Sequence, residues 1–162
     1  MRVYVSTNAK YAAGSLKGKW LDLKDYVDRD GFIEACLELH NDESNPELMF
    51  QDKEGIPDCL CSESRIEEEV WEILELDRDM QEAAIVFCDW QGGWDKYDFR
   101  DSYDGQYSSP EQWAREFLDD VGLFHKVDAW LEFYFDFERF ARDEMVDSMY
   151  YDEETGHMFR RF

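Results

Sequence analysis

The stretch SESRIEEEVWEILELDRDMQEAAIVFCDW, residues 62–90, decides how the rest of the chain is organised. It predicts two consecutive helices, because apolar residues recur in each half at the spacing of one helix face. These residues are Ile66, Val70, Ile73 and Leu74 in the first half and Met80, Ala83, Ala84 and Phe87 in the second. Ser64 followed by Glu67 predicts a capping box for the first helix, and Asp77 predicts the N-cap of the second. Gly92 predicts the end of the second helix.

The wet face of the first helix is strongly acidic. It carries five glutamates and no lysine: Glu67, Glu68, Glu69, Glu72 and Glu75. The whole chain has 40 acidic and 17 basic residues, a net charge of −23. Residues 1–40 are balanced, with six of each sign, whereas residues 41–80 carry a net −11 and residues 95–162 a net −10. A helix that only covers a core does not need this excess, so the acidic parts point to a function of their own.

The composition narrows the class of protein. The chain is 44% hydrophobic and 17% aromatic, which is typical of a folded protein and not of a disordered acidic tail. There is no basic patch for nucleic acid and no apolar run long enough to span a membrane. The first residues have no signal-peptide core, and the four cysteines have no secreted-scaffold spacing. We therefore expect a cytoplasmic protein that binds neither nucleic acid nor membrane.

The remaining patterns predict an α+β fold. Strands are expected at residues 2–6, 20–23 and 47–51, and a helix capped by Asp30 at residues 28–39. The expected subdomains are an N-terminal α+β subdomain at 1–61, a central acidic helical subdomain at 62–94 and a C-terminal α+β subdomain at 95–162.

In the last of these, residues 94–107 predict a half-exposed strand. Ser109 predicts the N-cap of a helix, with Pro110 at its first position and Gln112 completing the box. Residues 127–135 predict a short buried helix, Asp136 starts another helix, and residues 149–162 predict a hairpin. The aromatic run in this region, Trp130, Phe133, Tyr134, Phe135, Phe137 and Phe140, favours core packing over a base-stacking platform, because the acidic surroundings repel phosphate.

Sites for metals and catalysis are weakly indicated. Cys59 and Cys61, with His40 as a distant third ligand, lack the usual paired spacing of a zinc site. The acidic turn at 101–105 fails as a calcium loop, because Arg100 occupies the first ligand position. No nucleophile elbow or phosphate-binding glycine loop is present. We expect no catalytic residue, no metal and no cofactor.

The charge itself matches a nucleic acid in scale. Duplex DNA carries about two charges per ~3.4 Å of axis, so 23 charges correspond to roughly 11–12 base pairs. That length is about 39 Å, close to the ~40 Å diameter of a compact chain of 162 residues. The alternative is a solubilising acidic surface, but residues 1–40 are neutral, and charge gathered in one part favours a surface directed at a partner.

The chain resembles the ArdA antirestriction family over nearly its whole length. The resemblance rests first on VYV at 3–5, NAKY at 8–11 and GKWLDL at 18–23. It continues with ILELDRDMQEA at 73–83, similar to the acidic antirestriction motif, and YFDFERFARD at 134–143, similar to the C-terminal signature. The resemblance implies an elongated, three-part, dimeric protein of a mobile genetic element. It also implies imitation of bent duplex DNA in the DNA-binding groove of a type I restriction–modification enzyme.

Two sets of residues follow. We expect surface carboxylates to stand where phosphates would stand: Glu67, Glu68, Glu69, Glu72, Glu75, Asp77, Asp79, Glu82, Asp119, Asp120, Asp143, Asp147, Glu153 and Glu154. The resemblance places the antirestriction motif at or near a homodimer contact, for which the candidates are Ile73, Leu74, Leu76, Met80 and Ala83. Two alternatives stay open at this stage: an acidic inhibitor of another DNA-binding protein, and an acidic metal-binding or hydrolytic protein.

Overall fold

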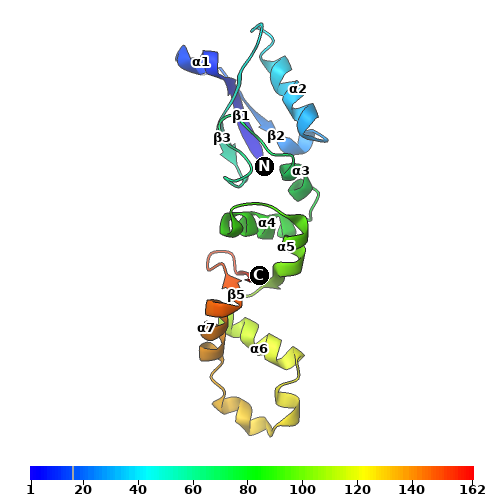
Figure 1. Cartoon of the computed structure of the whole chain (residues 1–162), viewed down its shortest axis with the longest axis vertical. Coiled ribbons are helices and arrows are strands. Elements are labelled where there is room, and N and C mark those ends of the chain that lie inside the picture. Colours follow the sequence, from blue (N-terminus) through cyan, green and yellow to red (C-terminus); the bar gives the residue numbers. More distant parts are fainter. Residues whose placement is uncertain (16) are drawn as a thin grey trace. The chain divides into compact units, whose positions relative to one another are not determined.

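The elements of the chain form two units in a computed structural model that describes residues 1–15 and 17–162 (Figure 1). Unit 1 is Met1–Lys96 and unit 2 is Tyr97–Phe162. Across the described residues there are seven α-helices and two three-stranded sheets. The predicted α+β class is therefore confirmed, while the finer division into three subdomains stays a prediction.

An antiparallel sheet of order β2-β1-β3 forms the base of unit 1. Its strands are β1 (Arg2–Thr7), β2 (Lys19–Asp22) and β3 (Leu48–Glu54). Val3 and Val5 of the central strand are fully buried, as the alternation of the sequence predicts. Two short helices follow strands: α1 (Asn8–Ala12) and the 3₁₀ helix η1 (Leu23–Asp25).

Helix α2 (Arg29–Leu39) closes the core of unit 1. Its N-cap is Asp28 and not Asp30, because the Asp28 Oδ1 accepts a hydrogen bond of 2.8 Å from the Gly31 N–H. Phe32 is fully buried, with its ring centroid 5.9 Å from those of Phe50 and of Trp71. The helix, the sheet and the acidic segment therefore share one core.

The two predicted acidic helices are present as α3 (Glu69–Leu74) and α4 (Arg78–Gln91). The predicted capping box at Ser64 is wrong, because a bridge between Cys61 and Ile66 keeps this part of the chain extended and delays the helix. Helix α4 begins after Asp77 and ends at Gly92, whose φ of 74° is left-handed, as predicted.

Unit 2 contains the second sheet, of order β4-β6-β5. Its strands are β4 (Tyr103–Gln106), β5 (Met149–Tyr151) and β6 (His157–Arg160), and the last two form the predicted hairpin. The half-exposed strand predicted at 94–107 is wrong for its first part, which is helix α5 (Lys96–Ser102). The helix buries Phe99 and Ser102, three residues apart, and leaves Tyr97 75% exposed.

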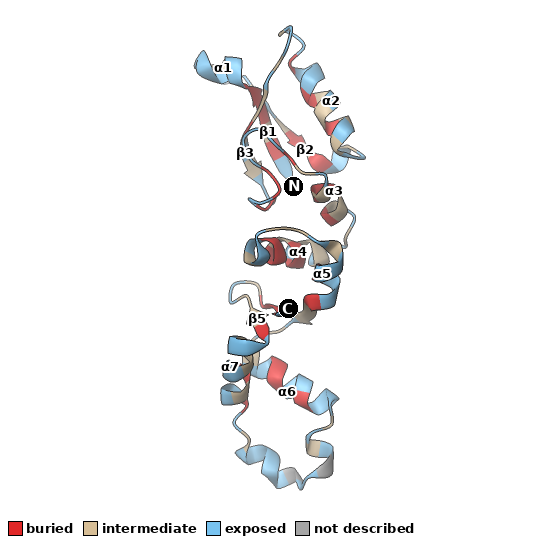
Figure 2. Ribbon diagram, in the orientation of Figure 1, coloured by how far each residue is buried: buried red, intermediate tan, exposed pale blue. Residues whose placement is uncertain are grey.

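Helices α6 (Pro110–Asp120) and α7 (Phe137–Asp147) pack together in unit 2. Trp113 of α6 stacks on Phe140 of α7, with ring centroids 6.2 Å apart. Between them run two 3₁₀ helices, η2 (Phe124–Lys126) and η3 (Ala129–Tyr134). The burial predicted for 127–135 is wrong: much of η3 is exposed, as Figure 2 shows by its pale blue colour.

Candidate functional site

The acidic face of unit 1 exists because the apolar residues of α3 and α4 turn inward. Val70, Trp71 and Ile73 are the buried residues of α3. In α4 the buried residues are Ala83, Ala84, Val86, Phe87 and Cys88. Once these residues pack into the core, the twelve remaining positions of the two helices keep solvent-accessible surface, and five of them are acidic: Glu69, Glu72, Asp79, Glu82 and Asp89.

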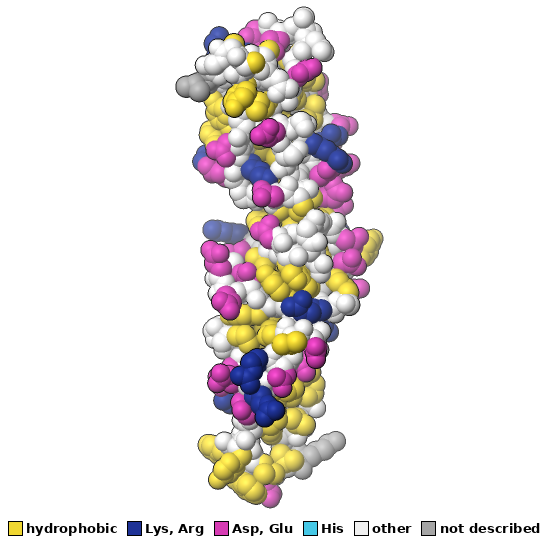
Figure 3. Space-filling model, turned by 60° about the vertical axis from the view of Figure 1, so that its left-hand side comes forward, with side chains coloured by type: hydrophobic (Ala, Val, Ile, Leu, Met, Phe, Trp, Pro, Cys, Tyr) yellow, Lys and Arg dark blue, Asp and Glu magenta, His cyan; other side chains and the backbone are white. Residues whose placement is uncertain are grey.

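None of the fourteen candidate carboxylate residues is buried. Glu67, Glu69 and Glu72 are half-buried, and the other eleven are exposed. Figure 3 shows Asp and Glu side chains on the surface of both units, with Lys and Arg side chains between them on the face drawn. The sequence prediction that these groups are available to a partner therefore agrees with their burial, while their role stays a prediction.

The three half-buried glutamates border a surface depression of about 390 Å³ that is lined by four glutamates and two arginines. Arg65 forms an ion pair with Glu67 at 2.7 Å. The Trp94 Nε1–H donates a hydrogen bond of 3.0 Å to the Glu72 Oε2. These contacts orient Glu67 and Glu72, whereas Glu68 and Glu75 are exposed.

The six candidate carboxylates of unit 2 are spread over helix α6, helix α7 and the turn between β5 and β6. Asp119 lies 3.4 Å from the His125 Nε2, and Asp143 lies 4.0 Å from the Arg139 Nε. Glu153 and Glu154 occupy the turn between β5 and β6. The neighbouring Asp152 carboxylate accepts hydrogen bonds from the Thr155 N–H and hydroxyl, at 2.8 and 2.6 Å, and so holds the turn in shape.

The residues expected at a dimer contact differ in exposure. Ile73 and Ala83 have no exposed surface, because both belong to the core of unit 1. Leu74, Leu76 and Met80 are half-buried and retain surface that a partner could cover. Within this set, the last three are the residues that can touch another chain directly.

Sequence reasoning missed an exposed apolar patch on η3 of unit 2. Phe133 is 90% exposed, Tyr134 81% and Trp130 58%, and Leu131 is also exposed. The same segment supplies Glu132 and Phe133 to a surface pocket of about 310 Å³, where the Arg115 guanidinium lies 3.9 Å from the Phe137 ring centroid. We call Trp130, Leu131, Phe133 and Tyr134 the aromatic patch. Its signal in the sequence was the run of large apolar residues, in which Trp130, Phe133, Tyr134 and Phe137 recur at helical spacing and so predicted a buried face.

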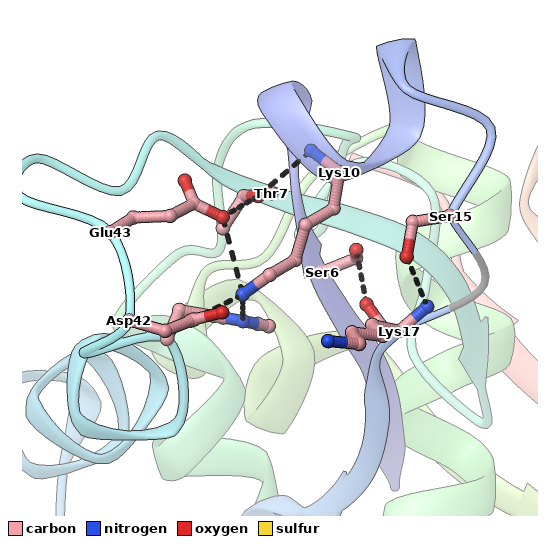
Figure 4. Close-up of polar contacts among 8 residues, drawn as sticks. Ser6, Thr7, Lys10, Ser15, Lys17, Asp42 and Glu43 are labelled. Atoms are coloured by element: carbon pink, nitrogen blue, oxygen red, sulfur yellow. Dashed lines mark hydrogen bonds and ion pairs between the residues drawn. The ribbon is translucent and has the colours of Figure 1, made fainter.

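A polar cluster at the end of the first sheet places a histidine against a lysine (Figure 4). The Lys10 Nζ lies 2.8 Å from the His40 Nδ1, 2.7 Å from Asp42 and 3.2 Å from Glu43. The Thr7 hydroxyl donates to Glu43 at 2.7 Å. Burial, followed by the nearby Lys10 ammonium, lowers the pKa of His40 below its ordinary value of 6.5. The contacts of Lys10 with His40, Asp42 and Glu43 join α1 to the segment that follows α2, so this cluster has a structural role in unit 1.

Both cysteines considered for a metal site make other contacts. The Cys59 thiol makes a hydrogen bond with Cys88, and Cys61 is buried with its thiol directed at the Ser62 carbonyl oxygen. Burial raises the pKa of Cys61, which favours the protonated thiol over the thiolate that binds metal. Over residues 1–15 and 17–162, no three His, Cys, Asp or Glu residues are grouped so that they could hold a metal ion.

Taken together, the fold and the surface define an acidic α+β protein whose carboxylates face solvent. A sequence model of the antirestriction protein (ArdA) family matches residues 3–159, and the chain belongs to this family. A search of curated proteins finds no match. Among the helices in the described part of the chain, none has the length and apolarity needed to cross a membrane.

Proposed function

We propose that this protein inhibits type I restriction–modification enzymes by occupying their DNA-binding groove as a mimic of duplex DNA. Membership of the antirestriction family supports the biological role. The observation that carries the mechanism is that all fourteen candidate carboxylates retain exposed surface, although they come from both units. We further propose that it acts in the cytoplasm, where a mobile genetic element that encodes it would need protection.

The mechanism rests on exchange of ion partners. A groove that binds DNA presents Lys and Arg side chains toward the phosphates, and the DNA releases condensed counterions when it enters the groove. Exposed carboxylates on a rigid surface can meet the same cations. Such binding should be fast and strongly weakened by salt, because charge steering is screened over a Debye length of about 8–10 Å.

An inhibitory role fits the carboxyl groups better than a catalytic one. A general acid needs a carboxyl whose pKa is raised by burial. Here the pKa of Asp42 is lowered by its hydrogen bond to Lys10, that of Glu54 by its hydrogen bond to Arg2, and that of Asp58 by its hydrogen bond to Lys53. These shifts keep the three carboxyl groups ionised, each beside a cation, so none of the three is poised as a general acid.

The test changes the charge of four glutamates on the acidic face and compares the loss of inhibition with that caused by neutralising four carboxylates elsewhere in unit 1. In the first variant Glu67, Glu68, Glu69 and Glu72 are replaced by lysine. In a second they are replaced by glutamine, so that its charge change equals that of a control in which Asp25, Asp30, Glu34 and Glu38 are neutralised to their amides. The control residues are all exposed and lie in the charge-balanced region 1–40.

We expect the glutamine block to weaken inhibition of a type I nuclease at least about tenfold, since each exposed ion pair contributes up to ~1 kcal/mol. The lysine block should weaken it further, and the control should remain near wild type. Equal inhibition by all three would contradict the proposal. Inhibition of another DNA-binding protein but not of the type I enzyme would favour the alternative partner.

We also propose that the protein is a homodimer. The motif residues with exposed surface, Leu74, Leu76 and Met80, are one candidate contact. The aromatic patch of η3 is the stronger candidate on physical grounds, because it exposes large apolar side chains that gain most from being covered. Only Glu132 adds a charge within the patch, so a second copy could approach it with less repulsion than over α3.

A further inference from the structure

Helix α3 is too short to hold its own position. It has six residues, about one and a half turns, and an isolated helix of this length is unstable in water. Its N-cap, Glu68, makes no side-chain capping bond. The orientation of its acidic face must therefore come from contacts with the rest of unit 1.

One side chain of α4 reaches back to the end of α3. The Gln81 Nε2 donates hydrogen bonds to the Leu74 carbonyl oxygen at 3.2 Å and to the Leu76 carbonyl oxygen at 2.8 Å. The last carbonyls of a helix have no partner within the helix, so the bond to Leu74 satisfies one of them. The bond to Leu76 holds the short connection between α3 and α4. Gln81 is half-buried, which shields these bonds from water.

A second contact joins the middle of α3 to the segment that follows α4. The Trp94 indole N–H donates to Glu72 at 3.0 Å, and the Trp94 ring lies edge-on to Phe87 of α4, with centroids 6.1 Å apart. Glu72 is thus held on the face that carries Glu68 and Glu75. The two contacts connect α3 to α4 and its C-terminal extension at different points along α3.

We propose that Gln81 is a positioning residue for the acidic face: by bonding the end of α3, it fixes the carboxylates of α3 relative to those of α4. This inference rests on the proposed function and deepens it. Charges that imitate a phosphate backbone must hold a fixed spacing, because a mobile charge loses conformational entropy when it pairs. Gln81 contributes no charge itself and acts through the spacing of Glu68, Glu72 and Glu75 against Asp79 and Glu82.

The test variant is Gln81→Met, which keeps the length and helix propensity of the side chain and removes its donors. The matched control is Gln91→Met at the exposed end of the same helix. If Gln81→Met does not fold, Trp94→Phe serves instead, because it removes the indole N–H that holds Glu72 and keeps an aromatic ring beside Phe87. Each protein is measured by amide hydrogen exchange and by inhibition of a type I nuclease over a range of salt concentrations.

We expect exchange at the end of α3 to accelerate about tenfold in Gln81→Met, and the apparent inhibition constant to rise by a similar factor. The slope of log affinity against log salt should also fall by about one ion, since fewer carboxylates meet their partners at once. Gln91→Met should match wild type in all three measurements. A change in folding stability alone would not alter the salt slope.

Unchanged exchange in α3 overturns the positioning role, whatever the nuclease assay shows. Faster exchange with unchanged inhibition and slope, in a protein that inhibits as wild type, overturns it as well. Failure of the wild-type protein to inhibit any type I enzyme defeats the proposed function instead, and the exchange data then decide whether Gln81 holds α3.

Discussion

The acidic helices of unit 1 and the segment 123–135 of unit 2 both contain many large apolar residues, but they use them in opposite ways. In α3 and α4 most apolar residues are buried, and the acidic residues keep exposed surface. In η3 the apolar residues are themselves exposed, and Phe133 is 90% accessible. The first region gains its stability within its own unit, whereas the second leaves apolar surface for a contact outside it.

The largest expected effect separates these two uses by folding stability. Ile73→Ala should destabilise unit 1 by about 2–5 kcal/mol, because Ile73 is fully buried and the truncation leaves a cavity. Phe133→Ala should change stability by less than about 0.5 kcal/mol, as expected for an exposed position. Urea unfolding followed by circular dichroism measures both. Similar losses in the two variants would break the comparison.

A smaller effect is expected on dimer formation. It tests which of the two apolar surfaces, the motif or the aromatic patch, contacts a second copy of the chain. We expect Phe133→Ser with Trp130→Ser to raise the dimer dissociation constant at least about tenfold, because the exposed rings lose the area that a partner would cover. Leu76→Ser with Met80→Ser should change it less. Light scattering at micromolar concentration distinguishes dimers from particles of 19.4 kDa. A wild-type protein that scatters only as a monomer rules out a stable dimer. If the Leu76 and Met80 variant raises the dissociation constant more than the Phe133 and Trp130 variant does, the dimer contact lies at the antirestriction motif.

The smallest effect uses pH, which acts on unit 1 through His40. Its folded pKa lies below 6.5 while the unfolded ring keeps its ordinary value, so the unfolded state takes up the proton first as the pH falls. Stability is therefore fully present above about pH 6.5 and declines below it. We expect the melting temperature to fall by a few degrees between about pH 7 and pH 5.5.

The matched variants identify the group responsible. His40→Gln should remove this slope, since glutamine does not titrate, whereas His125→Gln should keep it, because His125 is exposed. An unchanged slope in His40→Gln would show that another group causes the decline.

Much of the fold follows from local signals in the sequence. Ser109 with Pro110 marks the start of α6, and the Ser109 Oγ accepts from the Gln112 N–H at 3.1 Å, as the cap predicted. Gly92 and the terminal hairpin were found in the same way. These features depend on a few neighbouring residues, whose chemistry decides the backbone locally.

The predictions that failed depend on contacts outside the segment. Tyr97 and Phe99 alternate as in a strand, but the helix is selected by burial of Phe99 against Phe159, with ring centroids 6.4 Å apart. The capping box at Ser64 lost to the bridge between Cys61 and Ile66. In η3, Trp130, Phe133 and Tyr134 recur at the spacing of one helix face, which predicted a core, but the structure leaves all three exposed. The contacts of Gln81 with the end of α3 carry no sequence motif at all.

The open display of all fourteen carboxylates has an evolutionary consequence under the proposed function. A residue that only presents charge to solvent can change between Asp and Glu at the same position with little penalty, so selection acts on where the charge stands and not on which acidic side chain carries it. The opposing enzyme has less freedom. Under this proposal, a substitution in the enzyme's groove that weakens binding of the inhibitor also weakens binding of DNA. Resistance to the inhibitor therefore lowers the activity of the restriction enzyme for the host.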